Sequence, residues 1–313
     1  MRRAGIVLAA CAALLTAILL AAARVGERPG ALSDWQALVL GVVQGFTELL
    51  PISSSGHLII VPWVADWKYL EQHAAFNKTF DVALHVGTLI AVIAYFWRDI
   101  GRLIAAWFRS VSRREISTAE ERVAWYVLLA TIPAAIAGAV GEEFIEEKLG
   151  QPWQIAILMA VFAVVLWAAD RSPERRTMDQ LGFKAAIAIG IAQCLALAPG
   201  VSRSGITITA GRFFDLKRDD AARFSFLLLV PIVFGAAVLK GIKDIAFKGL
   251  PPGSAGPFVV GTIAAAVTGY IAIRALLGYL RRNDYTIFVV YRLVLAGAII
   301  ALMASGVRGA HFG

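Results

Sequence analysis

Charged residues are scarce in this sequence. Asp, Glu, Lys and Arg make up 17% of the 313 residues, whereas hydrophobic residues make up 59%. Soluble domains are about 25% charged and about 45–50% apolar. The apolar residues also fall in long blocks instead of alternating with polar ones. This composition excludes an ordinary soluble domain and predicts an all-α polytopic membrane protein.

Cysteine is almost absent as well. The sequence has two cysteines, Cys11 and Cys194, and both lie in apolar stretches. Two such distant residues offer neither a disulfide framework nor the spacing of a metal-ligand cluster. Cysteine chemistry is therefore not expected to support the fold or a site.

Long apolar segments predict the membrane-spanning helices. A bilayer core about 30 Å thick needs roughly 20 apolar residues per helix. About six to seven segments approach this length: 5–23, 82–97, 123–141, 153–169, 221–239, 256–280 and 285–305. The first, within residues 1–30, is expected to be an extra anchor helix or a signal-like segment, and its length favours an uncleaved anchor. Asp81 is expected to cap the helix 82–97.

The distribution of charge predicts the orientation of these segments. The net charge is +8, and arginines gather in the connections 98–122, 171–176 and 281–282. Loops rich in Lys and Arg stay in the cytoplasm. The acidic run 142–147 is expected to form a solvated loop on the opposite face. No basic stripe suits a nucleic acid, so the expected partners are membrane lipids.

Two apolar stretches are interrupted and cannot form simple spanning helices. Residues 36–65 contain Pro51-Ile52-Ser53-Ser54-Ser55-Gly56-His57, and residues 184–214 contain Pro199-Gly200-Val201-Ser202-Arg203-Ser204-Gly205. Helices broken at membrane depth survive where the freed backbone is buried in protein or lines a cavity. Two such segments in corresponding halves of a chain point to the functional site.

The two interruptions also resemble each other. Gln44 precedes Gly56 by 12 positions, and Gln193 precedes Gly205 by the same 12 positions. We therefore expect a single transmembrane domain, 1–313, built as an inverted-topology repeat. Its first repeat is 31–170, its second is 171–313, and each contains one broken re-entrant hairpin that enters from its own face of the membrane.

The polar residues of these breaks suit phosphate chemistry. Ionisable residues at membrane depth are functional candidates, here Glu48, His57 and Arg203. A guanidinium can bind two phosphate oxygens at once. Serine hydroxyls and the free amides at a helix start also favour an anion. The expected substrate-binding residues are Ser53, Ser55, Gly56, Ser202, Ser204 and Gly205.

These residues predict a division of roles in phosphoryl transfer. Glu48 is the acid, Ser54 or His57 is the nucleophile or base, and Arg203 is the phosphate clamp. Phosphoryl transfer needs mainly positioning and charge neutralisation, which such groups supply. Taken singly, each residue has a plainer interpretation: a serine run is commonly a turn, and a buried glutamate can be a structural partner of an arginine. Their joint occurrence in two matching breaks favours a site, whereas His85 is expected to pack in a helical core.

The motifs resemble those of the bacterial undecaprenyl pyrophosphate phosphatases of the bacitracin-resistance type. The resemblance rests on Gln44-Gly45-Phe46-Thr47-Glu48, on the serine-rich segment ending in Gly56-His57, and on the arginine-bearing segment 199–205. Residues 80–88 and 224–227 also resemble family segments, and the similarity extends from about residue 35 to about residue 304.

The resemblance implies a reaction and a set of site residues. It implies removal of one phosphate from the C55 isoprenyl pyrophosphate by Glu48, Ser54, His57 and Arg203, in a bacterial cytoplasmic membrane. It also implies a divalent cation, Mg²⁺ or Ca²⁺, near Glu48. Gln44, the second expected metal-binding residue, stands where many relatives have glutamate. A homodimer is compatible with the sequence.

Two other classes of protein compete with this interpretation. A secondary transporter or flippase of a polyprenyl phosphate would share the inverted repeat, the broken helices and the charged midplane site. A nucleophile candidate favours hydrolysis, because a carrier needs binding groups but no nucleophile. A purely structural membrane protein would have no reason to place Glu48 and Arg203 in matching breaks.

Overall fold

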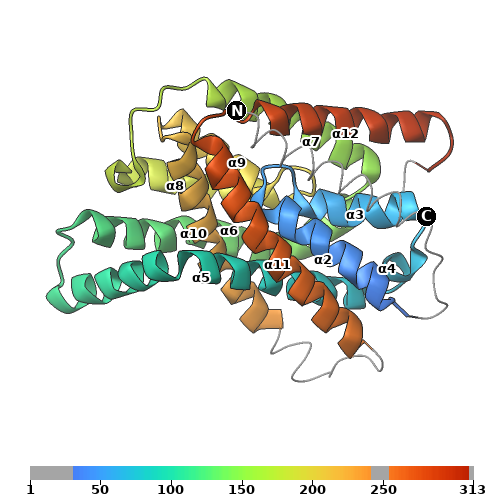
Figure 1. Ribbon diagram of the computed structural model, residues 1–313, viewed down its shortest axis with the longest axis horizontal. Coiled ribbons are helices and arrows are strands. Elements are labelled where there is room, and N and C mark those ends of the chain that lie inside the picture. The colour runs from blue at the N-terminus through green and yellow to red at the C-terminus, as the bar shows by residue number, and fades with distance from the viewer. Residues whose placement is uncertain (1–30, 241–253, 310–313) are drawn as a thin grey trace.

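The computed structural model describes residues 31–240 and 254–309, and every element named within them is helical (Figure 1). The expected helix 5–23 lies outside the described residues. The helices are α2 (Asp34–Leu49), α3 (Ser54–Ala65), α4 (Lys68–Gln72), α5 (Ala74–Arg113), α6 (Ala119–Lys148), α7 (Pro152–Asp170), α8 (Phe183–Cys194), α9 (Arg203–Phe213), α10 (Arg218–Lys240), α11 (Ala255–Leu280) and α12 (Thr286–Ala304). Two short 3₁₀ turns, Met178–Gln180 and Leu195–Leu197, precede and follow α8.

Six of these helices are long and apolar enough to cross a bilayer, namely α5, α6, α7, α10, α11 and α12. They coincide with the spanning segments predicted between residues 82 and 305. Large apolar side chains such as Val140, Val164 and Val294 lie exposed on them, as a lipid-facing surface requires. The multi-pass membrane class predicted from composition is confirmed.

Two helices are longer than their apolar segments suggest. α5 begins at Ala74 because Phe76 and Phe80 pack against Phe258 of α11. The prediction that Asp81 caps this helix is therefore wrong, since Asp81 lies inside it. α6 continues to Lys148, so the acidic run 142–147 is helical instead of a loop. Glutamate is a good helix former. In Figure 1, α5 and α6 form a long pair that lies side by side.

Both interrupted segments are broken as predicted. The first consists of α2 and α3, and the second consists of α8 and α9. The residue before each second arm, Ser53 or Ser202, has a positive φ of 74° or 77°. Each of these serines caps its helix by accepting a bond from a glycine amide, Gly56 N at 3.3 Å or Gly205 N at 3.0 Å. The two breaks thus share one local geometry.

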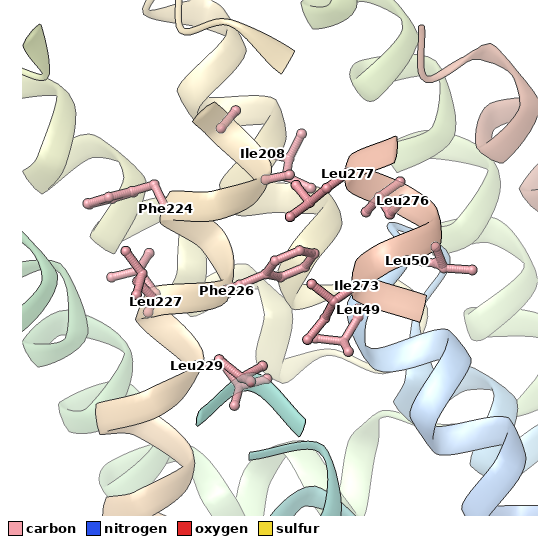
Figure 2. Close-up of a cluster of buried hydrophobic side chains, with 14 of the residues drawn as sticks. Leu49, Leu50, Ile208, Phe224, Phe226, Leu227, Leu229, Ile273, Leu276 and Leu277 are labelled. Atoms are coloured by element: carbon pink, nitrogen blue, oxygen red, sulfur yellow. The ribbon is translucent and has the colours of Figure 1, made fainter. Parts of the chain in front are cut away.

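An apolar cluster packs behind the breaks. Figure 2 shows Leu49 at the end of α2 beside Ile273 of α11, with Phe226 of α10 close by, and Leu50 belongs to the same cluster. Ile208 of α9 belongs to the same cluster. Side chains that are nearly inaccessible to solvent are held by close packing. The cluster therefore fixes the ends of both broken hairpins relative to α10 and α11.

The contact between α2 and α11 depends on the absence of a side chain at Gly45. A Cβ atom there would lie 1.9 Å from Thr268 Oγ1 and 2.7 Å from the Ala265 carbonyl oxygen. Small residues allow this close approach of helices in membranes. Gly45→Ala is expected to destabilise the fold by about 1–3 kcal/mol and to lower the thermal unfolding midpoint in detergent. Gly278→Ala is the control, because a Cβ at Gly278 meets nothing within 4 Å. Equal midpoints for the two variants would contradict the packing argument.

Candidate active site

The tips of the two broken hairpins are joined directly. The Gly200 amide of the second break donates to Ser53 Oγ of the first at 3.1 Å. In the opposite direction, Ser204 Oγ donates to the Leu50 carbonyl oxygen at 3.0 Å. Both bonds are buried, where they are shielded from competition by water. The two breaks that were expected to hold the site residues therefore lie against each other.

Glu48, in the last turn of α2, lies at the centre of the polar groups. Its Oε1 accepts two bonds from Arg203, from Nε at 3.2 Å and from Nη2 at 3.1 Å. Its Oε2 accepts bonds from the Ser54 hydroxyl and from Gln44 Nε2, the latter at 3.3 Å. Glu48 is 5% exposed and the Arg203 side chain 13%. A buried ion pair is tolerated when hydrogen bonds satisfy the remaining positions, as they do here.

Ser54 and Arg203 occupy corresponding positions in the two halves. Each is the first residue of the second arm of its hairpin, directly after the serine with positive φ. The first break places a hydroxyl there and the second a guanidinium, and both reach the carboxylate of Glu48. A serine hydroxyl that donates to a carboxylate has the arrangement of a nucleophile with its base.

The Arg203 guanidinium is held on its other side by α10. Its Nη1 donates to the carbonyl oxygen of Ser225 at 2.9 Å. The Thr207 hydroxyl, one turn along α9, lies 2.7 Å from Ser225 Oγ and 2.8 Å from the Arg203 carbonyl oxygen. Ser225 belongs to the segment 224–227 singled out in the sequence. α10 therefore fixes the direction in which Arg203 points.

His57 lies near these residues but is bonded elsewhere. Its Nδ1 lies 2.6 Å from the Ser53 carbonyl oxygen, and its Nε2 lies 2.7 Å from the Tyr291 hydroxyl. A carbonyl oxygen can only accept, so Nδ1 carries the proton and Nε2 accepts from Tyr291. Among the described residues, both ring nitrogens are thus engaged away from Glu48, Ser54 and Arg203.

The imidazole that faces Glu48 belongs to His85 of α5. Its Nε2 lies 3.4 Å from Glu48 Oε2, and its Nδ1 lies 2.7 Å from the Asp81 carbonyl oxygen. Both oxygens are acceptors, so the ring satisfies both when each nitrogen carries a proton. The expectation that His85 packs in a core is not met, because its side chain is 31% exposed and lies at the site. Its place in the family-like segment 80–88 was the one sequence signal for it.

Two oxygen atoms of the site could contribute to a cation site. Gln44 is wholly buried, and its Oε1 has no hydrogen-bond partner in the structure. The carboxylate of Glu48 lies beside the same side chain, since Gln44 Nε2 donates to it. Within the described residues, no group of three or more His, Cys, Asp or Glu side chains is placed to hold a metal.

The fold and site together define a polytopic membrane protein in which a serine, a carboxylate and a guanidinium meet at two broken helices. The chain belongs to the family described as bacitracin resistance protein BacA, which matches residues 37–298. It is 46% identical over 269 residues to the undecaprenyl-diphosphatase of Geobacter sulfurreducens, covering 85% of this chain and 97% of the relative. It is 45% identical over 283 residues to the undecaprenyl-diphosphatase of Thermomicrobium roseum, covering 88% and 99%. The family predicted from the motifs is confirmed.

Proposed function

We propose that this chain is an undecaprenyl-diphosphatase, which hydrolyses undecaprenyl pyrophosphate to undecaprenyl phosphate and inorganic phosphate. The names of relatives that match most of the chain support this activity. The observation that carries it is the bonding of Ser54 and Arg203, from two different breaks, to the single carboxylate of Glu48. The product is the lipid carrier on which cell-wall precursors are assembled.

Ser54 is the nucleophile in this proposal. Its Oγ attacks the terminal phosphorus while Glu48 accepts its proton, so an Oγ–P bond forms and the bond to the bridging oxygen breaks. Undecaprenyl phosphate leaves, and water then attacks the phosphoserine to release inorganic phosphate and restore the hydroxyl. The contact from the Ser54 hydroxyl to Glu48 supports this choice over His57, whose nitrogens are engaged with Ser53 and Tyr291. His57 then acts by supporting the backbone of the first break.

Arg203 and the helix starts hold the pyrophosphate in this proposal. When the substrate enters, Arg203 shares its donors between Glu48 and the phosphate oxygens, and its charge stabilises the transition state. The expected binding residues contribute in two ways. Ser53, Ser202 and Ser204 are buried and fix the breaks, which orients the amides of α3 and α9. Ser55 is expected to contact the anion, whereas Gly56 and Gly205, whose amides donate to Ser53 and Ser202, are expected to let the backbone approach it closely.

His85 is a further catalytic group of the proposed reaction. His85→Gln is expected to lower kcat by about 10²-fold and to change the pH dependence of kcat, because glutamine cannot carry the proton facing Glu48. His73→Gln is the matched control: His73 makes the same bond to a carbonyl one turn earlier, at 2.8 Å from Tyr69 O, but lies exposed. Steady-state phosphate release over a range of pH tests this. An unchanged kcat and pH profile in His85→Gln would contradict the role.

We include a divalent cation, Mg²⁺ or Ca²⁺, in the proposal. The unpartnered Oε1 of Gln44 is one oxygen donor, and the carboxylate of Glu48 would be a second where an ion replaced one of its present hydrogen-bond donors. Mg²⁺ is commonly held by one or two carboxylates together with substrate phosphates, so this pair fits an ion that the pyrophosphate helps to hold. When bound, such an ion would neutralise charge on the phosphate oxygens.

The inverted repeat is supported by the order and contacts of the helices. In this scheme α2, α3, α5, α6 and α7 correspond to α8, α9, α10, α11 and α12, which divides the chain into 31–170 and 171–313. α2 of the first half packs on α11 of the second, and α8, the counterpart of α2, packs on α6, the counterpart of α11. The two halves therefore make the same contact in both directions, as a repeat with exchanged helices requires. We place the protein in the bacterial cytoplasmic membrane, with each broken hairpin re-entrant, and a homodimer stays a prediction.

Phosphate release from C55 pyrophosphate in detergent, with Mg²⁺ or Ca²⁺, tests the proposed function. Release by the wild-type protein, with undecaprenyl phosphate as the lipid product, is the expected result. A folded wild-type protein that binds the lipid but releases no phosphate would overturn the proposed hydrolase activity and favour the flippase instead.

A further inference from the structure

Arg292 of α12 is a charged residue buried where the two breaks meet. Its side chain is inaccessible to solvent, and within the described residues it forms no ion pair with an acid. A lone buried guanidinium is costly unless its five donors find acceptors. At Arg292 these acceptors are all backbone carbonyl oxygens. A residue that is kept at the centre of the molecule despite this desolvation cost is expected to have a function there.

The carbonyl partners of Arg292 come from both breaks. Nη1 donates to Pro51 O of the first break at 3.4 Å, and Nη2 donates to Gly200 O at 2.9 Å and Val201 O at 3.1 Å in the second. Nε donates to Met159 O of α7 at 3.1 Å. One planar side chain thus links two non-helical segments that are far apart in the sequence, at positions two or three residues before Ser54 and Arg203, which reach Glu48.

The preceding residue extends this link. The Tyr291 hydroxyl bonds His57 Nε2 at 2.7 Å, and His57 Nδ1 holds the carbonyl oxygen of Ser53 at 2.6 Å. Ser53 has a positive φ, a conformation that is unfavourable outside glycine and persists when its surroundings hold it. The pair Tyr291-Arg292 therefore holds the backbone on either side of Ile52 in the first break.

The space for the guanidinium explains a glycine of the second motif. A Cβ atom at Gly205 would lie 3.0 Å from Ser202 Cβ and 3.1 Å from Arg292 Nη1, so a larger residue there would displace the guanidinium or the capping serine at the start of α9. Gly205, expected from the sequence to bind substrate, also makes room for Arg292.

We propose that the Tyr291-Arg292 pair of α12 positions the two breaks so that Ser54 and Arg203 converge on Glu48. Arg292 contacts backbone carbonyls and no reacting group, so it acts through the segments that it holds. Because the pair sits on a spanning helix, α12 is the element that ties the two hairpins into one site. This role rests on the proposed phosphatase activity.

Arg292→Lys tests the proposal against a matched buried arginine. Arg212 of α9 is also wholly buried and also donates to backbone carbonyls, including Asp170 O at 3.2 Å. It differs in its ion pair with Asp170 Oδ1 at 3.5 Å and in its place at the far end of α9. Lysine retains the charge in each case and loses the planar fork. For each variant, we would measure the thermal midpoint, and the kcat and KM of phosphate release per folded molecule.

Both lysine variants are expected to lower the midpoint. Arg292→Lys alone is expected to lower kcat by about 10–100-fold with KM within about threefold, because small misplacements of reacting groups are costly. Arg212→Lys should retain kcat within about threefold. If Arg292→Lys does not fold, Tyr291→Phe tests the proposal instead. Its kcat is expected to fall about threefold to tenfold, with an unchanged thermal unfolding midpoint.

The outcomes separate this inference from the proposed function. Wild-type release with an unchanged kcat in folded Arg292→Lys, or in Tyr291→Phe where that variant decides, would overturn the positioning role and leave the phosphatase intact. An equal loss of kcat in Arg212→Lys would also overturn it, since a general loosening of the fold would then explain both. No release by the wild-type protein would overturn the proposed function and this inference together.

Discussion

Glu48→Gln is expected to lower kcat for phosphate release from undecaprenyl pyrophosphate by about 10³-fold. Glutamine has nearly the same shape, so the effect would come from the lost charge and basicity. The carboxylate of Glu48 accepts bonds from Ser54, Gln44 and Arg203 and faces His85, and an amide group cannot accept from all of them. It would neither take the Ser54 proton nor balance the guanidinium.

A second glutamate provides the control for this variant. Glu121 is also buried and ion-paired, with Arg113, but it caps the start of α6 through bonds from Ser117 N and Thr118 N. Glu121→Gln is expected to lower the thermal midpoint while leaving kcat per folded molecule unchanged. The comparison uses phosphate release with each variant purified in the same detergent. Retention of kcat within about threefold in Glu48→Gln would contradict the proposed base.

The breaks and their polar residues were predictable because their signals are local. Pro51 and Pro199 interrupt apolar segments, and a proline within a helix removes a backbone donor and crowds the preceding turn. The spacing of Gln44 and Glu48 places them on one helix face, which the bond between them confirms. The sequence placed Glu48 and Arg203 in one candidate site, but the bonds between them are known only from the structure.

The contributions of α5 and α12 were not predictable in the same way. The start of α5 depends on Phe76 and Phe80 packing against α11, a contact between distant segments. In the sequence, His85 and Arg292 are each a single polar residue within an apolar run, and no neighbouring residue identifies a partner for either. Their roles follow from distances to Glu48 and to the carbonyls of the breaks, which the packing of the whole helical bundle sets.

Arg203→Ala is expected to lower kcat by about 10³-fold or more, the range seen when an arginine that stabilises a transferring phosphoryl group is lost. Arg203→Lys is expected to be intermediate, at about 10²-fold, because lysine keeps a charge but cannot bond Glu48 through two nitrogens while reaching Ser225 O. Comparing the two variants thus separates the effect of the positive charge of Arg203 from the effect of its guanidinium geometry. Phosphate release at saturating lipid, in the same detergent, measures both.

The control for Arg203 is an arginine with the same kinds of partner. Arg308 donates to Asp66 Oδ1 at 2.7 Å and to Val64 O at 2.9 Å, a carboxylate and a carbonyl as at Arg203, but at the far end of α3. Arg308→Ala should leave kcat within about twofold, since an exposed ion pair contributes at most about 1 kcal/mol. If Arg203→Ala kept its kcat as Arg308→Ala does, the guanidinium at the breaks would serve the fold alone. If Arg203→Lys fell as far as Arg203→Ala, the fork geometry of Arg203, more than its charge, would be what the phosphate requires.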